Sequence, residues 1–275
     1  MRIVVTGGSG KAGRWVIRDL LDQGHQVLNV DIAHDGTPHG LCAVADLTDQ
    51  GQALELIAGC DAVVHLAAIP APGIRSEAET FRINVLSTYN VFAAAIAAQV
   101  EKVVWASSET VLGLPFDTPP MFAPIDETIE PRPESSYALS KLLGEEMAAQ
   151  FARRSGIPFL GLRISNIMEP DDYQAFSGFW GDPALRKWNL WGYVDVRDVA
   201  LAVRLGLEAD LKGAEIAIVA AADTVMPTPS ADLMSKVYPE VPVRRPIEGR
   251  ETLLSIDRVR SLIGFEPEHS WQDHL

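Results

Sequence analysis

The sequence TGGSGKAG, residues 6–13, follows a short apolar run that begins at Arg2 and precedes a segment with helical periodicity. Its glycines Gly7, Gly10 and Gly13 recur every three residues. Glycine permits a tight turn between strand and helix, and it lets backbone N–H groups approach a pyrophosphate at the helix N-terminus. A glycine triplet alone is weak evidence. The strand before it and the helix after it favour a phosphate-binding turn over a plain strand–helix turn.

The segments after this turn alternate between short apolar runs and helical patterns. Strands are predicted at residues 26–31, 41–46, 61–68, 102–108 and 158–165, and helices at 53–59, 77–99 and 137–154. The run DAVVHLAA (61–68) shows no polar alternation, as expected for a strand with both faces buried. Repeated strand–helix units of this size predict an α/β fold, a Rossmann-type doubly wound parallel sheet with right-handed crossovers.

The regular alternation ends after Asn166. Residues 167–192 are rich in proline, glycine and tryptophan, and residues 193–209 restore a strand or turn followed by a helix. We therefore predict a nucleotide-binding domain at 1–166, joined by the return segment 193–209. A small discontinuous substrate-binding part, or lid, is predicted at 167–192 and 210–275.

The composition limits the classes of partner. The chain of 275 residues has a formal net charge of −14, which disfavours nucleic acids and anionic membranes, because both attract basic surfaces. No apolar run approaches the roughly 20 residues that span a bilayer, and no signal peptide is expected. The two cysteines form no CxxC pair, which fits a reducing cytoplasm, and the six histidines show no metal-ligand spacing, so no metal is expected.

An acidic residue at the end of the second predicted strand indicates which nucleotide the turn binds. A carboxylate at the position of Asp31 binds adenosine ribose hydroxyls and repels a 2′-phosphate. No Arg or Lys follows within the next several residues, so NAD is favoured over NADP, although Lys11 in the glycine loop is a possible phosphate ligand. Asp46, after the third strand, is interpreted as an adenine contact, as the N-cap of the following helix, or as both.

The stretch PESSYALSK, residues 133–141, places Tyr137 and Lys141 four residues apart. In a helix these positions share a face. A free tyrosine has a pKa near ~10 and is a poor base at neutral pH, whereas an ammonium beside it favours the phenolate. The spacing by itself fits either a catalytic acid/base pair or an ordinary surface pair.

Short motifs occur in one order along the chain: TGGSGKAG, Asp31, DL (46–47), HLAA (65–68), NV (84–85), SS (107–108) and YALSK (137–141), then YVDVRDVA (193–200) and LIGFEPEHSW (262–271). The ordered set resembles the extended short-chain dehydrogenase/reductase family, the group of NAD-dependent epimerases and dehydratases, and is most similar to uronate and sugar dehydrogenases. The resemblance implies NAD as cofactor. It implies cofactor contacts from Gly7, Gly10, Lys11, Ala12, Gly13, Asp31, Asp46, Leu47, Leu66, Ala67, Ala68, Asn84, Tyr137 and Lys141.

The same resemblance implies three catalytic residues. Tyr137 takes the proton of a substrate hydroxyl, Ser108 hydrogen-bonds the reacting oxygen, and Lys141 lowers the pKa of the tyrosine and binds the nicotinamide ribose. Ser107 is expected to face the other side of the strand. Asn84 is expected to be mainly structural or part of a proton relay, and His65 is expected to be structural.

The residues after the catalytic serine and after the sixth strand limit which reactions and substrates are expected. Dehydratases of the family carry Thr-Asp-Glu where this chain has Ser-Glu-Thr at 108–110, which argues against a sugar 4,6-dehydratase. The stretch SNIMEPDDYQ (165–174) is similar to uronate dehydrogenases and implies substrate contacts from Ser165, Asn166 and Gln174. Gln174 stands where those enzymes hold the substrate carboxylate with an Arg, so a neutral sugar or a different acid is favoured.

Other substrate contacts are left open by the sequence. Arg75, Arg186 and Lys187 either supply positive charge to the site or are solvated surface residues. The tryptophans of 179–194 either stack on a sugar ring or pack the lid, and packing is the commoner use of aromatic side chains.

The combined interpretation is an NAD-dependent oxidoreductase that acts on a secondary hydroxyl of a sugar or sugar derivative. The alternatives are a nucleotide-sugar epimerase with tightly held NAD and a regulator that binds NAD without turnover. Because the chain keeps both Tyr137 and Lys141, the regulator is disfavoured. Family resemblance further implies a homodimer that pairs the helices at about 77–99 and 137–154.

Overall fold

The computed structural model describes residues 1–33 and 40–274. Its centre is a seven-stranded parallel sheet with the order β3-β2-β1-β4-β5-β6-β9. The strands are β1 (Arg2–Thr6), β2 (Gln26–Asp31), β3 (Leu41–Val44), β4 (Ala62–His65), β5 (Lys102–Ser108), β6 (Phe159–Ile164) and β9 (Ala214–Val219). The predicted Rossmann-type doubly wound sheet is confirmed.

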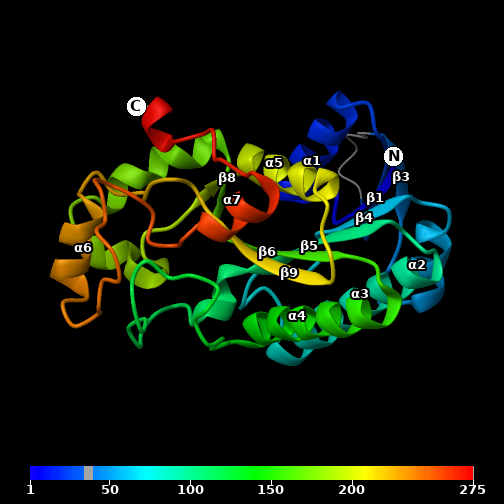
Figure 1. The fold of residues 1–275 in the computed structure, drawn as a ribbon, viewed down its shortest axis with the longest axis horizontal. Helices are drawn as coiled ribbons and strands as arrows, with labels where there is room; N and C mark the ends of the chain where they lie inside the picture. The colour runs from blue at the N-terminus through cyan, green and yellow to red at the C-terminus, as the bar shows by residue number, and fades with distance from the viewer. Residues whose placement is uncertain (34–39, 275) are drawn as a thin grey trace.

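Helices cover both faces of the sheet (Figure 1). On one face lie α1 (Lys11–Asp22), α5 (Val196–Glu208) and, beside β9, α7 (Asp257–Ile263). On the other face lie α2 (Gln50–Ile57), α3 (Glu77–Ala97) and α4 (Ser136–Ser155), with α3 packed along both of its neighbours. The burial of apolar residues on both sides of β1, β4 and β5 explains why these strands lack polar alternation.

The strand register brings the chemically important loops to one edge of the sheet. Thr6 pairs with Val30 on one side and with His65 on the other, and Ser108 pairs with Ile164. The carboxyl ends of β1, β2, β4, β5 and β6 therefore meet at the same edge. Ligands of open α/β sheets bind at this edge.

A smaller layer lies beyond this edge. It contains the two-stranded ladder of β7 (Ile167–Met168) and β8 (Val194–Asp195), the 3-10 segments η2 (Pro170–Phe179) and η3 (Pro183–Asn189), and helix α6 (Ser230–Val237). Two further 3-10 segments are η1 (Glu109–Leu112), directly after β5, and η4 (Trp271–His274). Because β9 belongs to the main sheet, the predicted boundary at residue 210 does not follow the architecture.

The YVDVRDVA segment ties the two layers together. Asp195 is the N-cap of α5, accepts hydrogen bonds from the Arg197 guanidinium, and accepts the Tyr173 hydroxyl of η2. Asp198 accepts the backbone N–H groups of Glu268 and His269 at 3.0 and 3.1 Å. No helix within the described ranges is long and apolar enough to cross a membrane.

Candidate active site

The glycine loop is closely packed and leaves no room for side chains. Gly7 has φ +72°, and a Cβ there would lie 2.6 Å from the backbone nitrogen of Ala67. A Cβ on Gly13 would lie 2.2 Å from the Gly7 carbonyl oxygen, and one on Gly8 would lie 2.2 Å from Asn29 Oδ1. Gly10 is the N-cap of α1 and leaves the first helical N–H groups without a side-chain cap. This arrangement fits a pyrophosphate at the helix N-terminus. The role of Gly8 was missed because the three-residue spacing does not include it.

The two predicted acidic contacts differ in their surroundings. Asp31 is half-buried at the end of β2, and its carboxylate accepts the N–H of Ser9 at 3.0 Å and that of Ile32 at 2.7 Å. A carboxylate has further acceptor sites, so Asp31 fits a ribose diol. Asp46 is exposed and accepts the backbone N–H and the hydroxyl of Thr48, which lower the pKa of this carboxyl. The N-cap of α2 is Asp49, so the N-cap interpretation of Asp46 is wrong.

The side chain of Lys11 points to the lid. Its ammonium forms an ion pair with Asp172 of η2 at 2.5 Å and donates to the Ile167 carbonyl at 3.1 Å. Nearby, Glu169 accepts from Arg14 and Trp15 of α1. The glycine loop and the lid are therefore joined by charged contacts.

The loop after β4 completes the predicted cofactor side. Leu66, Ala67 and Ala68 are half-buried, and Leu47, in the loop after β3, is buried in the apolar cluster against which Ala67 packs. Asn84 of α3 binds this loop through Ile69, accepting its N–H at 2.8 Å and donating to its carbonyl at 3.1 Å. Asn84 therefore has a structural function here, as expected, while its role toward NAD stays a prediction.

The three predicted catalytic residues converge at the end of β5. Ser108, Tyr137 and Lys141 are 6%, 8% and 7% exposed. The Ser108 hydroxyl acts on Tyr137 and favours the ionised form of the phenol. The Lys141 ammonium donates to the Ala106 carbonyl at 2.8 Å and lies 5.7 Å from the Tyr137 ring centroid. The i, i+4 spacing thus places phenol and ammonium side by side.

The pKa values of this pair are dominated by burial. Burial raises the pKa of Tyr137 to about 12, while the hydrogen bond from Ser108 lowers it and the charge of Glu109 raises it further. Burial lowers the pKa of Lys141 to about 8. The expected lowering of the tyrosine pKa is not found for the protein chain by itself, because burial of the phenolate outweighs the favourable effect of the Ser108 hydroxyl and the charge of Glu109 adds to burial.

Buried polar contacts hold the residues that lie behind the end of β5. Ser107 faces away from Ser108, as predicted, and donates to Glu145 at 2.6 Å. Glu145 forms a buried ion pair with Arg163 at 2.7 Å. His65 hydrogen-bonds Thr6 and Thr88, and burial lowers its pKa to about 3, so it is neutral and structural.

A second cluster of polar side chains directly follows the catalytic serine. Glu109 is 3% exposed. Its carboxylate accepts from Ser165 Oγ at 2.6 Å and from Asn189 Nδ2 at 3.0 Å. The backbone N–H of Asn166 also favours the ionised form. Burial raises the pKa of Glu109 to about 7, against these hydrogen bonds and the positive charge of Arg186.

Arg186 of η3 belongs to the same cluster and is not a solvated surface residue. It is 5% exposed, donates to the Gly192 carbonyl at 3.2 Å, and stacks on Trp188 with its guanidinium carbon 4.4 Å from the ring centroid. Burial lowers the pKa of Arg186 to about 10, and the negative charge of Glu109 opposes this shift.

The sequence interpretation missed Glu109 and Asn189 as site residues. The one local signal was the position of Glu109 beside Ser108.

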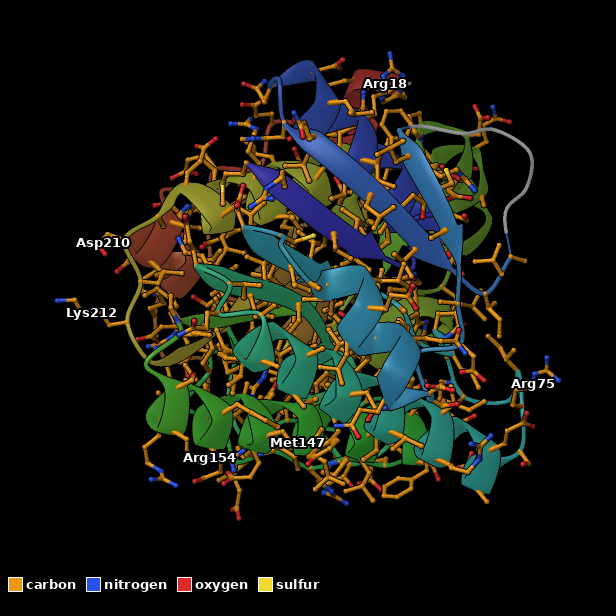
Figure 2. The ribbon with its side chains drawn as sticks, turned by 90° about the vertical axis from the view of Figure 1, so that its right-hand side faces the viewer. Arg18, Arg75, Met147, Arg154, Asp210 and Lys212 are labelled. Carbon is orange, nitrogen blue, oxygen red and sulfur yellow. The ribbon has the colours of Figure 1, made fainter. Side chains whose placement is uncertain are left out.

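The remaining predicted substrate residues are divided. Ser165 and Asn166 contact Glu109, but Gln174 is exposed on η2. Figure 2 shows Arg75 projecting from the molecule, and it is exposed. Trp180 donates to the Val225 carbonyl and the fully buried Trp191 to the Pro183 carbonyl, which supports the packing interpretation for both.

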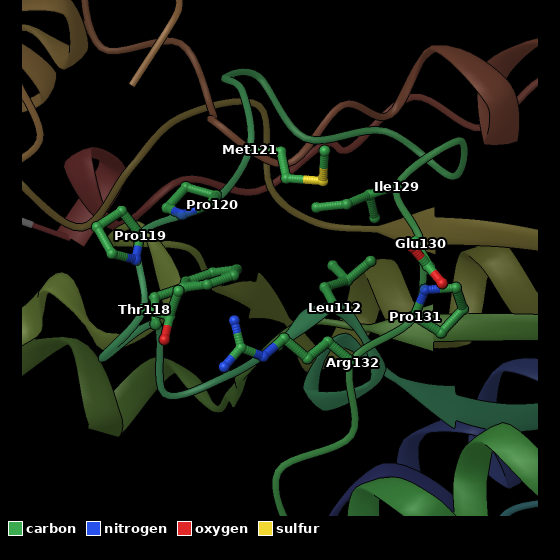
Figure 3. A pocket seen from close by; sticks show the side chains of 11 residues that line it. Leu112, Thr118, Pro119, Pro120, Met121, Ile129, Glu130, Pro131 and Arg132 are labelled. Carbon is green, nitrogen blue, oxygen red and sulfur yellow. The ribbon is translucent and has the colours of Figure 1, made fainter. Parts of the chain in front are cut away.

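A pocket of about 270 Å³ lies beside the loop after η1 (Figure 3). Leu112, Phe116, Ile129 and several prolines line it, and the side chain of Arg132 extends among them. None of the three predicted catalytic residues lines it. The pocket borders η1, the segment that follows Ser108, and it is not the site described above.

The glycine loop, the acidic residue after β2 and the Ser–Tyr–Lys cluster define the chain's class. Residues 3–219 match the model of the NAD dependent epimerase/dehydratase family, and the chain belongs to that family. The family uses NAD, and its members include sugar dehydrogenases and epimerases of the extended short-chain dehydrogenase/reductase type.

Individual relatives agree with this assignment. An L-arabinose 1-dehydrogenase (NAD(P)(+)) of Haloferax volcanii is 33% identical over 186 residues, covering 62% of this chain and 69% of the relative. A uronate dehydrogenase of Pseudomonas syringae pv. tomato is 30% identical over 185 residues, covering 64% of this chain and 63% of the relative. This chain thus spans about two thirds of their length.

Among solved structures, a short-chain dehydrogenase/reductase superfamily protein from Agrobacterium tumefaciens with bound NAD superposes on this fold. Its TM-score is 0.77 at 25% identity, and the match covers 99% of this chain and 94% of that chain.

Proposed function

We propose that this protein is an NAD-dependent dehydrogenase that oxidises a secondary hydroxyl of a sugar. The observation that carries the proposal is the convergence of Ser108, Tyr137 and Lys141, all buried, at the sheet edge that also holds the glycine loop. The relatives named as sugar dehydrogenases support the substrate class.

In the proposed reaction, NAD supplies the acceptor for hydride. Ser108 hydrogen-bonds the reacting oxygen, and Tyr137 accepts the hydroxyl proton. Lys141, fixed on the Ala106 carbonyl, keeps a positive charge beside the phenol. Because burial holds the pKa of Tyr137 near 12, the tyrosine needs positive charge nearby to act as a base at neutral pH.

The glycine loop, Asp31 and the loop after β4 are the residues proposed to hold NAD. The close packing at Gly7 and Gly13 leaves the N-terminus of α1 open to a pyrophosphate. Because the Lys11 ammonium is engaged by Asp172, it is not free to select a 2′-phosphate, and this supports NAD over NADP.

The proposal is tested by NADH formation with the purified protein. The panel contains neutral aldoses, uronic acids and nucleotide sugars, with NADP run in parallel. Stoichiometric NADH from a free sugar supports the dehydrogenase. An epimerised sugar without net NADH would replace it with the epimerase alternative, and no product from any panel member would contradict both.

We also propose a homodimer in the cytoplasm. Leu86, Tyr89 and Leu139 on α3 and α4 are 38%, 45% and 39% exposed. Figure 2 shows Met147 and Arg154 on the side of α4 that faces away from the sheet. This partly apolar face fits the helix pairing implied by family resemblance. The two free cysteines, one of them exposed, fit a reducing compartment.

A further inference from the structure

A buried acid and a buried base lie together beside the catalytic hydroxyls. Glu109 is the residue after Ser108, and its charge acts on Tyr137. The positive charge of Arg186 acts on Glu109, although the two form no direct ion pair in the described part of the chain. The buried polar layer between η1 and η3, which we call the η1–η3 wall, therefore contains one negative and one positive group next to the catalytic residues.

The negative group cannot turn away from the site. Ser165, which follows β6, holds Glu109 Oε2, and Asn189 from η3 holds Oε1. The Arg186 guanidinium is fixed by Trp188 and the Gly192 carbonyl. Both charges are thus preorganised, and each compensates the other without solvent screening.

An incoming carboxylate would need a cation that is not already compensated. Lys11 is already compensated by Asp172, whereas the charged Lys141 is held by the neutral Ala106 carbonyl beside the Tyr137 ring, where the reacting hydroxyl is proposed to bind. Lys187 lies 6.0 Å from the Tyr238 ring centroid. A carboxylate beside Arg186 would also face the fixed carboxylate of Glu109, and this repulsion disfavours it.

A sugar hydroxyl meets no such penalty. The buried Asn189 Oδ1 has no hydrogen-bond partner among the described atoms, and Glu109 is a carboxylate acceptor. A neutral hydroxyl is both donor and acceptor. A hydroxyl can therefore donate to Glu109 or accept from Arg186 without adding charge to the site.

We propose that Glu109 and Arg186 form a charge-compensated pair that fits the site to a neutral sugar and discriminates against the corresponding sugar acid. The inference rests on the proposed function, because it assigns the substrate class of the same site. It differs from the uronate preference in the name of the Pseudomonas syringae relative.

The test uses sugars that differ only at carbon 6: D-galactose with D-galacturonate, and D-glucose with D-glucuronate. For each pair, kcat/KM is measured with saturating NAD at about pH 8.5, where Glu109, with its pKa of about 7, is ionised. The variants are Glu109→Gln, which removes the negative charge, and Arg186→Met, which removes the positive charge. Glu240→Gln, at an exposed acid, is the matched control.

We expect the wild type and the control to prefer the neutral member of a pair at least tenfold. Glu109→Gln should reduce that ratio about tenfold, because Arg186 is then uncompensated, and Arg186→Met should increase it. A wild-type preference for the uronate, or the same ratio in both charge variants, would overturn the inference.

Binding separates this inference from the proposed function. In Tyr137→Phe with NAD present, quenching of tryptophan fluorescence reports sugar binding without turnover, since Trp188 stacks on Arg186. Selective binding of the neutral sugar without NADH from the wild type would support the inference and contradict the dehydrogenase. NADH formed mainly from the uronate would support the dehydrogenase and contradict the inference. Binding of neither sugar would overturn the inference.

Discussion

At the scale of single residues, the site balances burial against charge. Tyr137 and Lys141 are both more than nine-tenths buried, and burial moves both pKa values toward the neutral form. Keeping a charged ammonium in this buried position costs free energy, and the cost is offset only when a charged partner or transition state is present. Lys141 should therefore lower the stability of the protein while it supports activity.

Lys141→Met should show this cost directly. In the native state the pKa of Lys141 is lowered from 10.5 to about 8, so between these values the unfolded state binds more protons and the stability of the wild type rises with pH. Relative to the wild type, the variant should be most stable below pH 8 and lose this advantage as the pH approaches about 10.5. The difference in unfolding free energy should change by up to about 3 kcal/mol.

Urea unfolding at several pH values checks this prediction. Lys236→Met, at an exposed lysine of α6, is the matched control and should show no such change. A pH-independent difference between Lys141→Met and the wild type would contradict the account.

The sequence predicts the residues whose relationship is local. Tyr137 and Lys141 share a helix face because of their four-residue spacing, and Ser108 stands at the end of a clearly apolar strand. Glu109 and Asn189, in contrast, are 80 residues apart and meet only through the packing of η3. Their contact has no periodicity that a single sequence reveals, and the burial of Arg186 depends on the same packing.

At the scale of elements, the glycine loop is the part that tolerates least change. Gly13→Ala would place a Cβ 2.2 Å from the Gly7 carbonyl oxygen, so the loop and α1 must move apart. NAD affinity should fall at least tenfold, as measured by fluorescence titration. Gly178→Ala meets no atom within 4 Å and should bind NAD like the wild type. Unchanged affinity in Gly13→Ala would argue against this loop as the pyrophosphate site.

The C-terminal segment depends on the start of α5. Asp198 is fully buried and accepts two backbone N–H groups and the His269 ring, whose Nδ1 lies 2.7 Å away. Asp198→Ala would leave these donors unpaired, at a cost of about 2–4 kcal/mol in unfolding free energy. Denaturant unfolding measures the loss, with Asp210→Ala at an exposed acid as control. A loss equal to that of the control would show that this contact does not hold the C-terminus.

Elements with a clear period are predicted closely. The helix expected at 77–99 is α3 (Glu77–Ala97), and the strand expected at 102–108 is β5 with the same bounds. The lid was left without elements because η2 and η3 are 3-10 segments without a repeating apolar face. They take their shape from tertiary contacts such as those of Tyr173 with Asp195.

At the scale of the whole molecule, the site lies where the sheet edge meets the lid. Lys11 and Arg14 on the cofactor side contact Asp172 and Glu169 on the lid side, so the two parts form one structure. The prediction of a separate part at 210–275 was inaccurate because β9 extends the sheet after the lid has begun. Sequence order alone cannot show which part a late strand joins.

The proposed dimer is also a property of this scale. The double substitution Leu86→Asp, Tyr89→Asp places two charges on the outer face of α3 and should yield monomers in sedimentation velocity, because apolar contact drives such helix pairing. Leu54→Asp on α2, at a residue of similar exposure (38%), should leave the assembly unchanged. A wild type that is already monomeric would contradict the proposal.

The most direct test of the central claim compares NADH formation by the wild type and by Tyr137→Phe with the same neutral sugar, together with NAD affinity. Tyr89→Phe, at a half-exposed tyrosine on α3, is the matched control. The account predicts that Tyr137→Phe loses a factor of about 10²–10⁴ in kcat and binds NAD like the wild type, while the control keeps full activity. Full activity in Tyr137→Phe would contradict the assignment of Tyr137 as the base.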